Sequence, residues 1–169
     1  MATVRRIYSY LVCAISLQAI CWALISLLWQ VLYERQRSDT TSLAFQIAVM
    51  LIGLPVFLIH WLWSQRLANR DMEERASLAR RIYLYLMLAA FLGPALFQAY
   101  GLGQALLRQI FGLPLPDYAT LSVAVGRPLT ALLVLLLLWG YQRWIIRQDD
   151  QVAGFSIEGA IDRIYHLVF

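Results

Sequence analysis

Residues 7–33 read "IYSYLVCAISLQAICWALISLLWQVLY", and this run of 27 residues contains no Asp, Glu, Arg or Lys. A helix rises about 1.5 Å per residue, so the run exceeds the roughly 20 residues needed to cross a hydrocarbon core of about 30 Å. Residues 40–65 and 82–107 also lack these four residue types, and residues 119–146 carry only two arginines. The sequence therefore predicts four membrane-spanning segments.

The composition is typical of a chain that folds in lipid. Of its 169 residues, 61% are hydrophobic and 14% are charged, against about 45–50% and about 25% in soluble domains. A spanning segment must satisfy its backbone hydrogen bonds internally, and continuous apolar runs exclude the alternating pattern of barrel strands. We therefore predict an all-α fold, a polytopic transmembrane helical bundle with spans at about 7–33, 41–65, 82–108 and 119–146.

The start of the first span returns later in the chain. The stretch "RRIYSYLVCAISL" at 5–17 reappears as "RRIYLYLMLAAFL" at 80–92, with 8 of 13 positions identical. The next helices also match, because "GLPVF" at 53–57 has its counterpart in "GRPLT" at 126–130. Each unit holds two spans, so both units enter the membrane from the same side. This pattern predicts two parallel hairpins related by an axis along the membrane normal, unlike inverted repeats.

The repeat divides the chain into predicted units at 1–78 and 79–155. A third related stretch, "IDRIYHLVF", occupies 161–169. We interpret residues 156–169 as the start of a third unit and of a fifth helix, which is incomplete here. On this interpretation the chain either ends in a short stub or is a fragment of a longer protein, and we favour the fragment.

The distribution of arginine predicts an orientation. Ten arginines fall on the side of the N-terminus, the link between the units and the C-terminal tail, and four fall on the other side. Cytoplasmic segments carry the excess of basic residues. We expect a multi-pass protein of the inner cell membrane with both termini in the cytoplasm. A cleaved secretory signal is the alternative, but signal cores hold only about 7–15 apolar residues and a signal has no reason to recur in mid-chain.

The two helix openings are predicted to anchor the chain at the membrane surface. Arginine side chains reach headgroups and tyrosines populate the aromatic belt. Within each opening an arginine and a tyrosine four residues apart are expected to stack. The charged link at 66–81 is expected to be a solvated helical connector. The eight predicted interface anchors are Arg5, Arg6, Tyr8, Tyr10, Arg80, Arg81, Tyr83 and Tyr85.

These openings, a proline-containing second helix that ends in aromatic residues, and the repetition of both resemble a known family. The family comprises bacterial and archaeal four-helix integral membrane domains classed as a domain of unknown function. The resemblance covers about residues 5–147. It implies the four-helix architecture and carries no assigned chemistry, so no functional residue is transferred.

Four residues inside the spans are candidates for function: Arg127, Gly93, Pro94 and His60. An ionisable residue within a span indicates a functional site by default, although Arg127 would snorkel to the surface, or lie in a loop if the helix began at Pro128. Proline kinks a helix, so Gly93-Pro94 predicts a bend that serves as a hinge, as a cavity wall or for packing against a bulky neighbour. His60 would need a second ligand to hold a cofactor, so we expect a structural role.

Small and amide side chains are predicted to assist helix packing. Ala95, Ala99 and Gly103 form a small-xxx-small stripe that lets another helix approach closely, within the chain or between copies. The glutamines at positions 18, 46, 98 and 104 are expected to add hydrogen bonds between helices.

The sequence offers no motif for catalysis. It has no Ser/His/Asp arrangement, HExxH, Cys-x-x-Cys or phosphate loop in a suitable context, so we predict a non-enzyme without catalytic, cofactor-binding or metal residues. The predicted spans also lack Asp and Glu, which argues against proton-coupled transport.

Three hypotheses for function follow. The first is a structural or accessory module that packs with other membrane helices. The second is a small transporter or channel component for a neutral, lipidic or anionic solute, and the third is a membrane cofactor carrier or enzyme. The expected partners are the lipid bilayer and a second copy or another membrane protein, with no nucleic acid.

Overall fold

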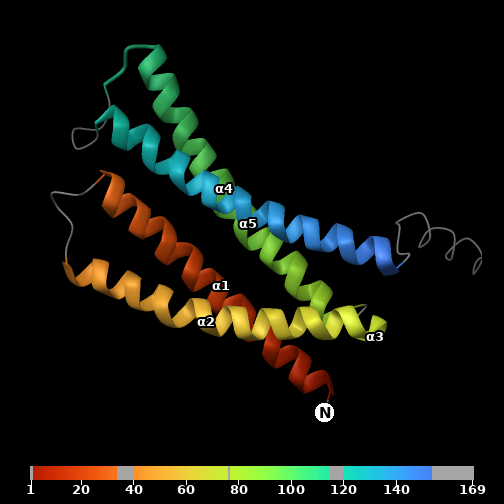
Figure 1. Ribbon diagram of the computed structural model, residues 1–169. Helices are drawn as coiled ribbons and strands as arrows, with labels where there is room; N and C mark the ends of the chain where they lie inside the picture. The colour runs from red at the N-terminus through yellow and green to blue at the C-terminus, as the bar shows by residue number, and fades with distance from the viewer. Residues whose placement is uncertain (1, 34–39, 76, 115–119, 154–169) are drawn as a thin grey trace, which may run out of the picture.

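The computed structural model describes residues 2–33, 40–75, 77–114 and 120–153. These residues form helices and connecting turns without a strand, which confirms the all-α prediction. The predicted fifth helix and third unit at 156–169 lie outside the described residues. The helices, shown in Figure 1, are α1 (Ala2–Tyr33), α2 (Thr40–Arg70), α3 (Met72–Arg75), α4 (Leu78–Ile110) and α5 (Leu121–Ala153).

Four of the helices are long and apolar enough to cross a membrane, which agrees with the predicted number of spans. The candidate spans are Val4–Tyr33, Thr40–Arg70, Leu78–Ile110 and Leu121–Gln151. Each extends past the predicted apolar window. A helix of 31 residues is about 46 Å long, which exceeds a hydrocarbon core of about 30 Å. Charged residues therefore continue these helices beyond the apolar runs instead of ending them.

The long helices pack as two parallel hairpins. Helix α1 runs along α2 and α4 runs along α5, and α1 and α4 begin at the same end of the bundle (Figure 1). This arrangement confirms the predicted pairing. We call the end where α1 and α4 begin and α2 and α5 finish the charged end, because it holds the ion pairs described below.

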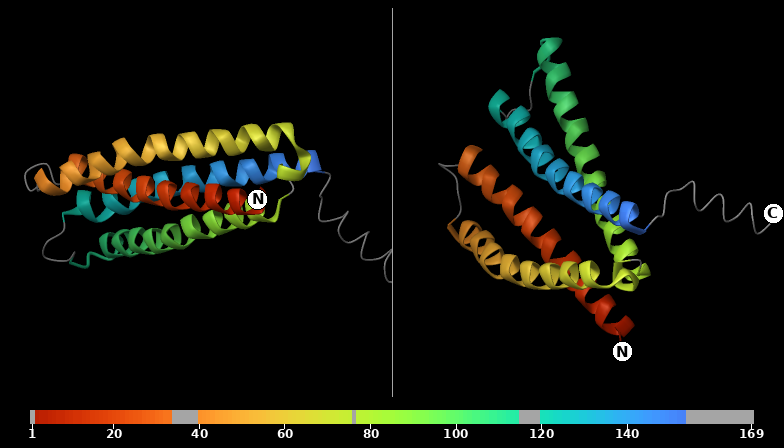
Figure 2. Two further views of the ribbon diagram at one scale, coloured as in Figure 1. Left: turned by 90° about the horizontal axis from the view of Figure 1, so that it is seen from below. Right: turned by 45° about the vertical axis from the view of Figure 1, so that its right-hand side comes forward.

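The hairpins join asymmetrically. A two-fold axis would exchange α1 with α4 and α2 with α5, so an α1–α5 contact would be matched by an equal α4–α2 contact. Helix α1 contacts both α4 and α5, whereas the backbones of α2 and α4 scarcely approach each other. The left view of Figure 2 shows α2 and α4 on opposite sides of the bundle. A two-fold relation between the hairpins is therefore excluded, although the hairpins are parallel. An axis along the membrane normal with another rotation stays a prediction.

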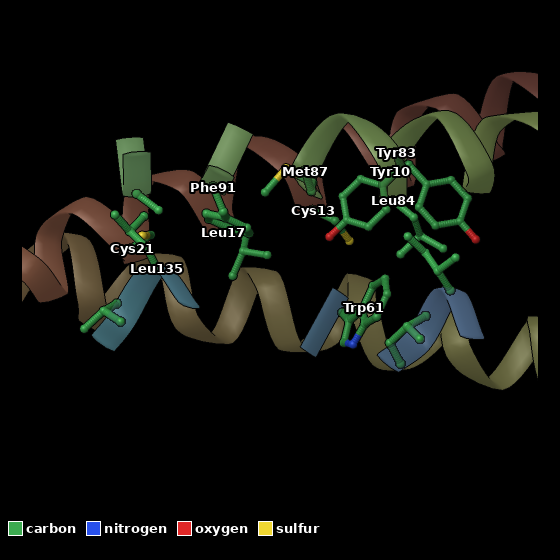
Figure 3. Packing of buried hydrophobic residues seen from close by; sticks show 14 of the residues in the cluster. Tyr10, Cys13, Leu17, Cys21, Trp61, Tyr83, Leu84, Met87, Phe91 and Leu135 are labelled. Atoms are coloured by element: carbon green, nitrogen blue, oxygen red, sulfur yellow. The ribbon is translucent and has the colours of Figure 1, made fainter. Parts of the chain in front are cut away.

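The core lies where α1 meets α4 and α5. Its innermost side chains include Cys13, Cys21, Phe91 and Leu135, which are at most 1% exposed, and several of them appear in Figure 3. Both cysteines are free. A third of the apolar window of α1 is buried, compared with 6% of that of α2. Helix α1 is thus the central helix and α2 a peripheral one.

The small-residue stripe of α4 faces outward along most of its length. Ala95 is buried, but Ala99 is exposed and a Cβ added at Gly103 would meet no atom within 4 Å. A Cβ at Gly93 would also meet open space, and Pro94 lies inside a helix that continues to its end. The interpretation of Gly93 as a place for a bulky neighbour is therefore wrong, because this face is turned away from the other helices.

Candidate functional site

Arg80, at the start of α4, is the most deeply buried charged side chain among the described residues, at 1% exposed. Its Nε and Nη2 donate to the two carboxylate oxygens of Asp149 at 2.6 Å and 3.3 Å. Nη2 also donates to Gln65 Oε1 at 3.1 Å, and Nη1 to the Tyr10 hydroxyl at 3.5 Å. A bidentate arginine–carboxylate pair is both strong and directional. Arg80 thereby links α4 to α1, α2 and α5.

Aromatic rings form a layer against this charge. The Arg80 guanidinium lies 5.8 Å from the centroid of the Trp61 ring, and Trp61 Nε1 donates to the Tyr141 hydroxyl at 2.7 Å. Tyr83 lies between Trp61 and Tyr10, with ring centroids 5.6 Å and 5.3 Å away (Figure 3). Stacked and tilted rings at these distances attract each other, and a cation over an indole adds to this. The layer joins the four long helices at the charged end.

The short helix α3 carries two residues that bind in different directions. Glu74, only 7% exposed, accepts from Arg5 Nη2 at 2.9 Å and from Arg6 Nε at 2.8 Å. Arg75 Nε lies 3.5 Å from Asp149 Oδ1. The link between the units is therefore not a solvated connector along its whole length. It ties the start of α1 to the end of α5.

The predicted anchoring role is wrong for three of the eight residues. Arg80, Tyr83 and Tyr10 are 1%, 3% and 6% exposed, so they are enclosed by helices and do not reach headgroups. Their counterparts in the other unit behave differently, because Tyr8 and Tyr85 are exposed. The two openings therefore present opposite tyrosines to the core, since the hairpins are packed asymmetrically.

The remaining anchors keep surface positions. Arg5 is exposed, and Arg6 and Arg81 are half-buried. Arg5 and Arg6 face the carboxylate of Glu74, so part of their charge is neutralised within the chain. Anchoring by these arginines and by Tyr8 and Tyr85 stays a prediction.

Arg127 lies at the opposite end of the bundle, where α1 meets α5. Helix α5 begins at Leu121, so the alternative that places Arg127 in a loop before the helix is wrong. Trp29 Nε1 donates to the backbone carbonyl of Arg127 at 3.0 Å, and the guanidinium lies 5.6 Å from the centroid of the Trp29 ring. The hydroxyls of Tyr33 and Thr130 share a hydrogen bond of 3.1 Å. This end is therefore a second junction between the hairpins.

His60 takes a position typical of a structural histidine. Its Nδ1 lies 2.8 Å from the Val56 carbonyl, and because a carbonyl only accepts, Nδ1 carries the proton. The ring meets the edge of Tyr8 at 6.1 Å between centroids. The described residues hold no group of three or more His, Cys, Asp or Glu side chains suited to a metal ion. The other histidine, His166, lies outside the described residues.

Sequence reasoning missed several members of the charged cluster: Asp149, Gln65, Glu74, Trp61 and Tyr141. One signal was available, since acidic side chains lie at the ends of predicted spans on the same side as the paired arginines. That signal places opposite charges at one end of the bundle. It does not say which arginine is enclosed or which carboxylate faces it.

The attachment of α3 is open to a direct test. Glu74→Gln keeps the shape of the side chain and removes its ion pairs with Arg5 and Arg6. We expect the free energy of unfolding to fall by about 1–3 kcal/mol and hydrogen exchange over 70–78 to accelerate, because a hydrogen bond to a charged group is worth about that much. Asp150→Asn, at an exposed position, is the control. Equal exchange in both variants would contradict the role of Glu74.

Comparison with curated proteins and with solved structures finds no match. A family model does match, over residues 6–141, and it describes a domain of unknown function, DUF5671. The matched region covers all of α2 and α4 and most of α1 and α5, from Arg6 to Tyr141 beside Trp61. Because the match extends over most of the 169 residues, the chain belongs to the DUF5671 family.

Proposed function

We propose that the protein is a multi-pass protein of the inner membrane that acts as a non-enzymatic structural or accessory helical module. The observation that carries this proposal is the filled junction between the hairpins. Phe91, Cys13, Cys21 and Leu135 leave at most 1% of their surface exposed. At the charged end of the same junction, the buried Arg80 side chain forms an ion pair with Asp149. Such a junction supports a bundle that keeps one shape.

The module would contact its partner through α2. Phe45, Ile52 and Ile59 are exposed and recur every seven residues, which places them on one side of the helix. Association of helices in lipid depends on side-chain packing between surfaces of this kind. A second copy or another membrane protein would be bound here.

The alternatives gain less support. Transport needs a path through the bundle, and a cavity lined by Gln18, Gln98 and Arg127 would support it. Three hollows in the described part of the chain lie elsewhere: two at the charged end and one between α1 and α4. A cofactor carrier would rely on His60, and the described residues hold no group of three or more His, Cys, Asp or Glu side chains suited to a metal ion.

Photo-crosslinking tests the proposed contact surface. A photoreactive residue at Ile52 or Ile59 is expected to yield a discrete protein adduct in intact membranes. The matched control is Leu137 of α5, which is also exposed and apolar. Adducts of twice the chain mass would identify a second copy, and another single mass would identify a different partner. Lipid adducts alone at all three positions would contradict the proposal.

The proposed orientation rests on the excess of arginine at the charged end. Asn69→Cys and Leu113→Cys place exposed thiols near opposite ends of the bundle, in a background with Cys13→Ala and Cys21→Ala. A membrane-impermeant maleimide applied to spheroplasts is expected to label position 113 but to reach position 69 only after permeabilisation. Labelling of position 69 alone in intact spheroplasts would reverse the orientation.

A further inference from the structure

A polar hollow of about 370 Å³ lies at the charged end, lined by the start of α1, the end of α2 and α3. Its volume falls within the roughly 300–1,000 Å³ of small-molecule sites. Trp63, Arg66, Leu67 and Arg70 of α2 line it, and Arg5 of α1 lies across from them. The four α2 residues follow the i, i+3, i+4, i+7 spacing, so they form one continuous face of the helix.

Arg66 and Arg70 differ from Arg5 and Arg6 at this end. Both are exposed, and neither makes a hydrogen bond or ion pair with the described residues. Arg5 and Arg6 are instead bound to Glu74. The hollow therefore presents two guanidinium groups, four residues apart, whose donors have no partner within the described chain.

The charge around the hollow is positive. Its lining includes two carboxylates, those of Asp71 and Glu74. Glu74 is buried beneath Arg5 and Arg6, so its charge is already opposed by two arginines. Three guanidinium groups, those of Arg5, Arg66 and Arg70, line the hollow with the two carboxylates, and Arg6 opposes Glu74 from outside it. The planar fork of arginine matches the oxygens of a phosphate group, which it binds with two parallel hydrogen bonds.

The level of the hollow along α2, just beyond the apolar part of the helix, points to a lipid ligand. The apolar part of α2 from Leu43 to Trp63 is about 31 Å long, close to the thickness of a hydrocarbon core. Arg66 and Arg70 then lie roughly 5 Å and 10 Å beyond Trp63 along the helix, at the level of the headgroups. Trp63 is half-exposed, in the interfacial position where tryptophan is enriched.

We propose that this hollow binds the phosphate group of an anionic lipid, with Arg66 and Arg70 as its ligands and Trp63 beside the glycerol backbone. The recognised chemistry is a phosphate ester, which a lipid headgroup or a soluble molecule supplies. The position of the hollow beyond a core-length apolar segment assigns it to the lipid.

Native mass spectrometry of the full chain in a neutral detergent tests the site. Phosphatidylglycerol and phosphatidylcholine serve as the anionic and zwitterionic lipids. Arg66→Gln/Arg70→Gln is expected to weaken phosphatidylglycerol binding about thirty-fold, since each arginine near an anionic surface contributes about five-fold. Arg66→Lys/Arg70→Lys keeps the charge and loses the fork, so its affinity should be intermediate.

The matched control is Arg143→Gln/Arg147→Gln. These two arginines are also exposed, four residues apart and near the charged end, but they do not line the hollow. The control should retain phosphatidylglycerol within about three-fold of the original chain, because surface substitutions without local partners have small effects. An equal loss of phosphatidylglycerol affinity in both double variants would overturn the site, because it would indicate only a general attraction between basic side chains and an anionic lipid.

Competition identifies the source of the phosphate. Glycerol 1-phosphate in large excess should fail to displace phosphatidylglycerol, because it lacks acyl chains. Displacement by this soluble ester, with the same dependence on Arg66 and Arg70, would overturn the lipid assignment. Thermal melts followed by circular dichroism should coincide for all the variants. If Arg66→Gln/Arg70→Gln unfolds at a lower temperature, Arg66→Lys/Arg70→Lys takes its place in the comparison.

Discussion

Asp149→Asn is expected to lower the free energy of unfolding by about 3–5 kcal/mol, the largest loss that we predict for a single conservative change. The substitution keeps the volume of the side chain and removes its charge. Arg80, 1% exposed, would then lie in the bundle without a counter-ion in bidentate contact, held by Gln65, the Tyr10 hydroxyl and at most the one amide oxygen that asparagine keeps. A buried charge without its counter-ion costs several kcal/mol because neither water nor lipid reaches it.

Asp150→Asn provides the control one residue away. Asp150 is exposed and makes no hydrogen bond or ion pair with the described residues, so its change should stay within about 0.5 kcal/mol. Unfolding in mixed micelles by titration with dodecyl sulfate, followed by circular dichroism, measures both variants. Equal stability of the two would contradict the role of the Arg80–Asp149 pair.

The double variant Arg80→Met/Asp149→Leu distinguishes two quantities: the contribution of the whole ion pair to the free energy of unfolding, and the loss caused by removing only one of its charges. A buried ion pair replaced by apolar side chains of similar volume often leaves stability unchanged or raises it. We therefore expect the double variant to be more stable than Asp149→Asn alone. A double variant that is less stable than Asp149→Asn would indicate that the pair contributes more than charge compensation.

Gly126→Ala is expected to lower the free energy of unfolding by about 1–3 kcal/mol, the usual range for overpacking. A Cβ at this position would lie 2.5 Å from two carbon atoms of the Tyr33 ring and 2.5 Å from its hydroxyl oxygen, closer than atoms in contact. Tyr33 would have to swing away and give up its hydrogen bond with Thr130. The same movement would loosen the junction of α1 and α5 beside Trp29.

Gly140→Ala tests the same change in the same helix without the contact. A Cβ at Gly140 would meet nothing within 4 Å. Alanine is favoured over glycine in helix interiors by about 0.5–1 kcal/mol, so this variant should be as stable as the original or slightly more. Thermal melts in mild detergent compare the two variants. A loss at position 140 that equalled the loss at position 126 would show that the Tyr33 contact is unimportant.

The number and pairing of the long helices followed from the sequence because lipid restricts both. An apolar run must be long enough to cross the core, and its backbone must satisfy its own hydrogen bonds. The recurring arginine and tyrosine opening marked the start of each hairpin, and the even number of spans made the hairpins parallel. These constraints act on each segment separately, so they can be recognised without knowing what the segment contacts.

The candidate sites followed from the sequence only in part. His60 was expected to be structural, and its bond to Val56 fits that role. Arg80 was taken for a surface anchor because its motif is the same as that of Arg5, yet Arg80 is enclosed and Arg5 is exposed. Identical motifs cannot be told apart when their difference lies in which neighbouring helix covers them.

The sequence by itself determined the four long helices, their apolar cores and their grouping in two parallel hairpins. Only the tertiary structure decided that α1 lies at the centre, that the hairpins join without two-fold symmetry, and that Arg80 is enclosed by Asp149, Gln65 and Tyr10. The physical reason is the range of the interactions. Span length and apolar composition belong to one segment, whereas burial and ion pairing depend on the rotation of each helix against its neighbours.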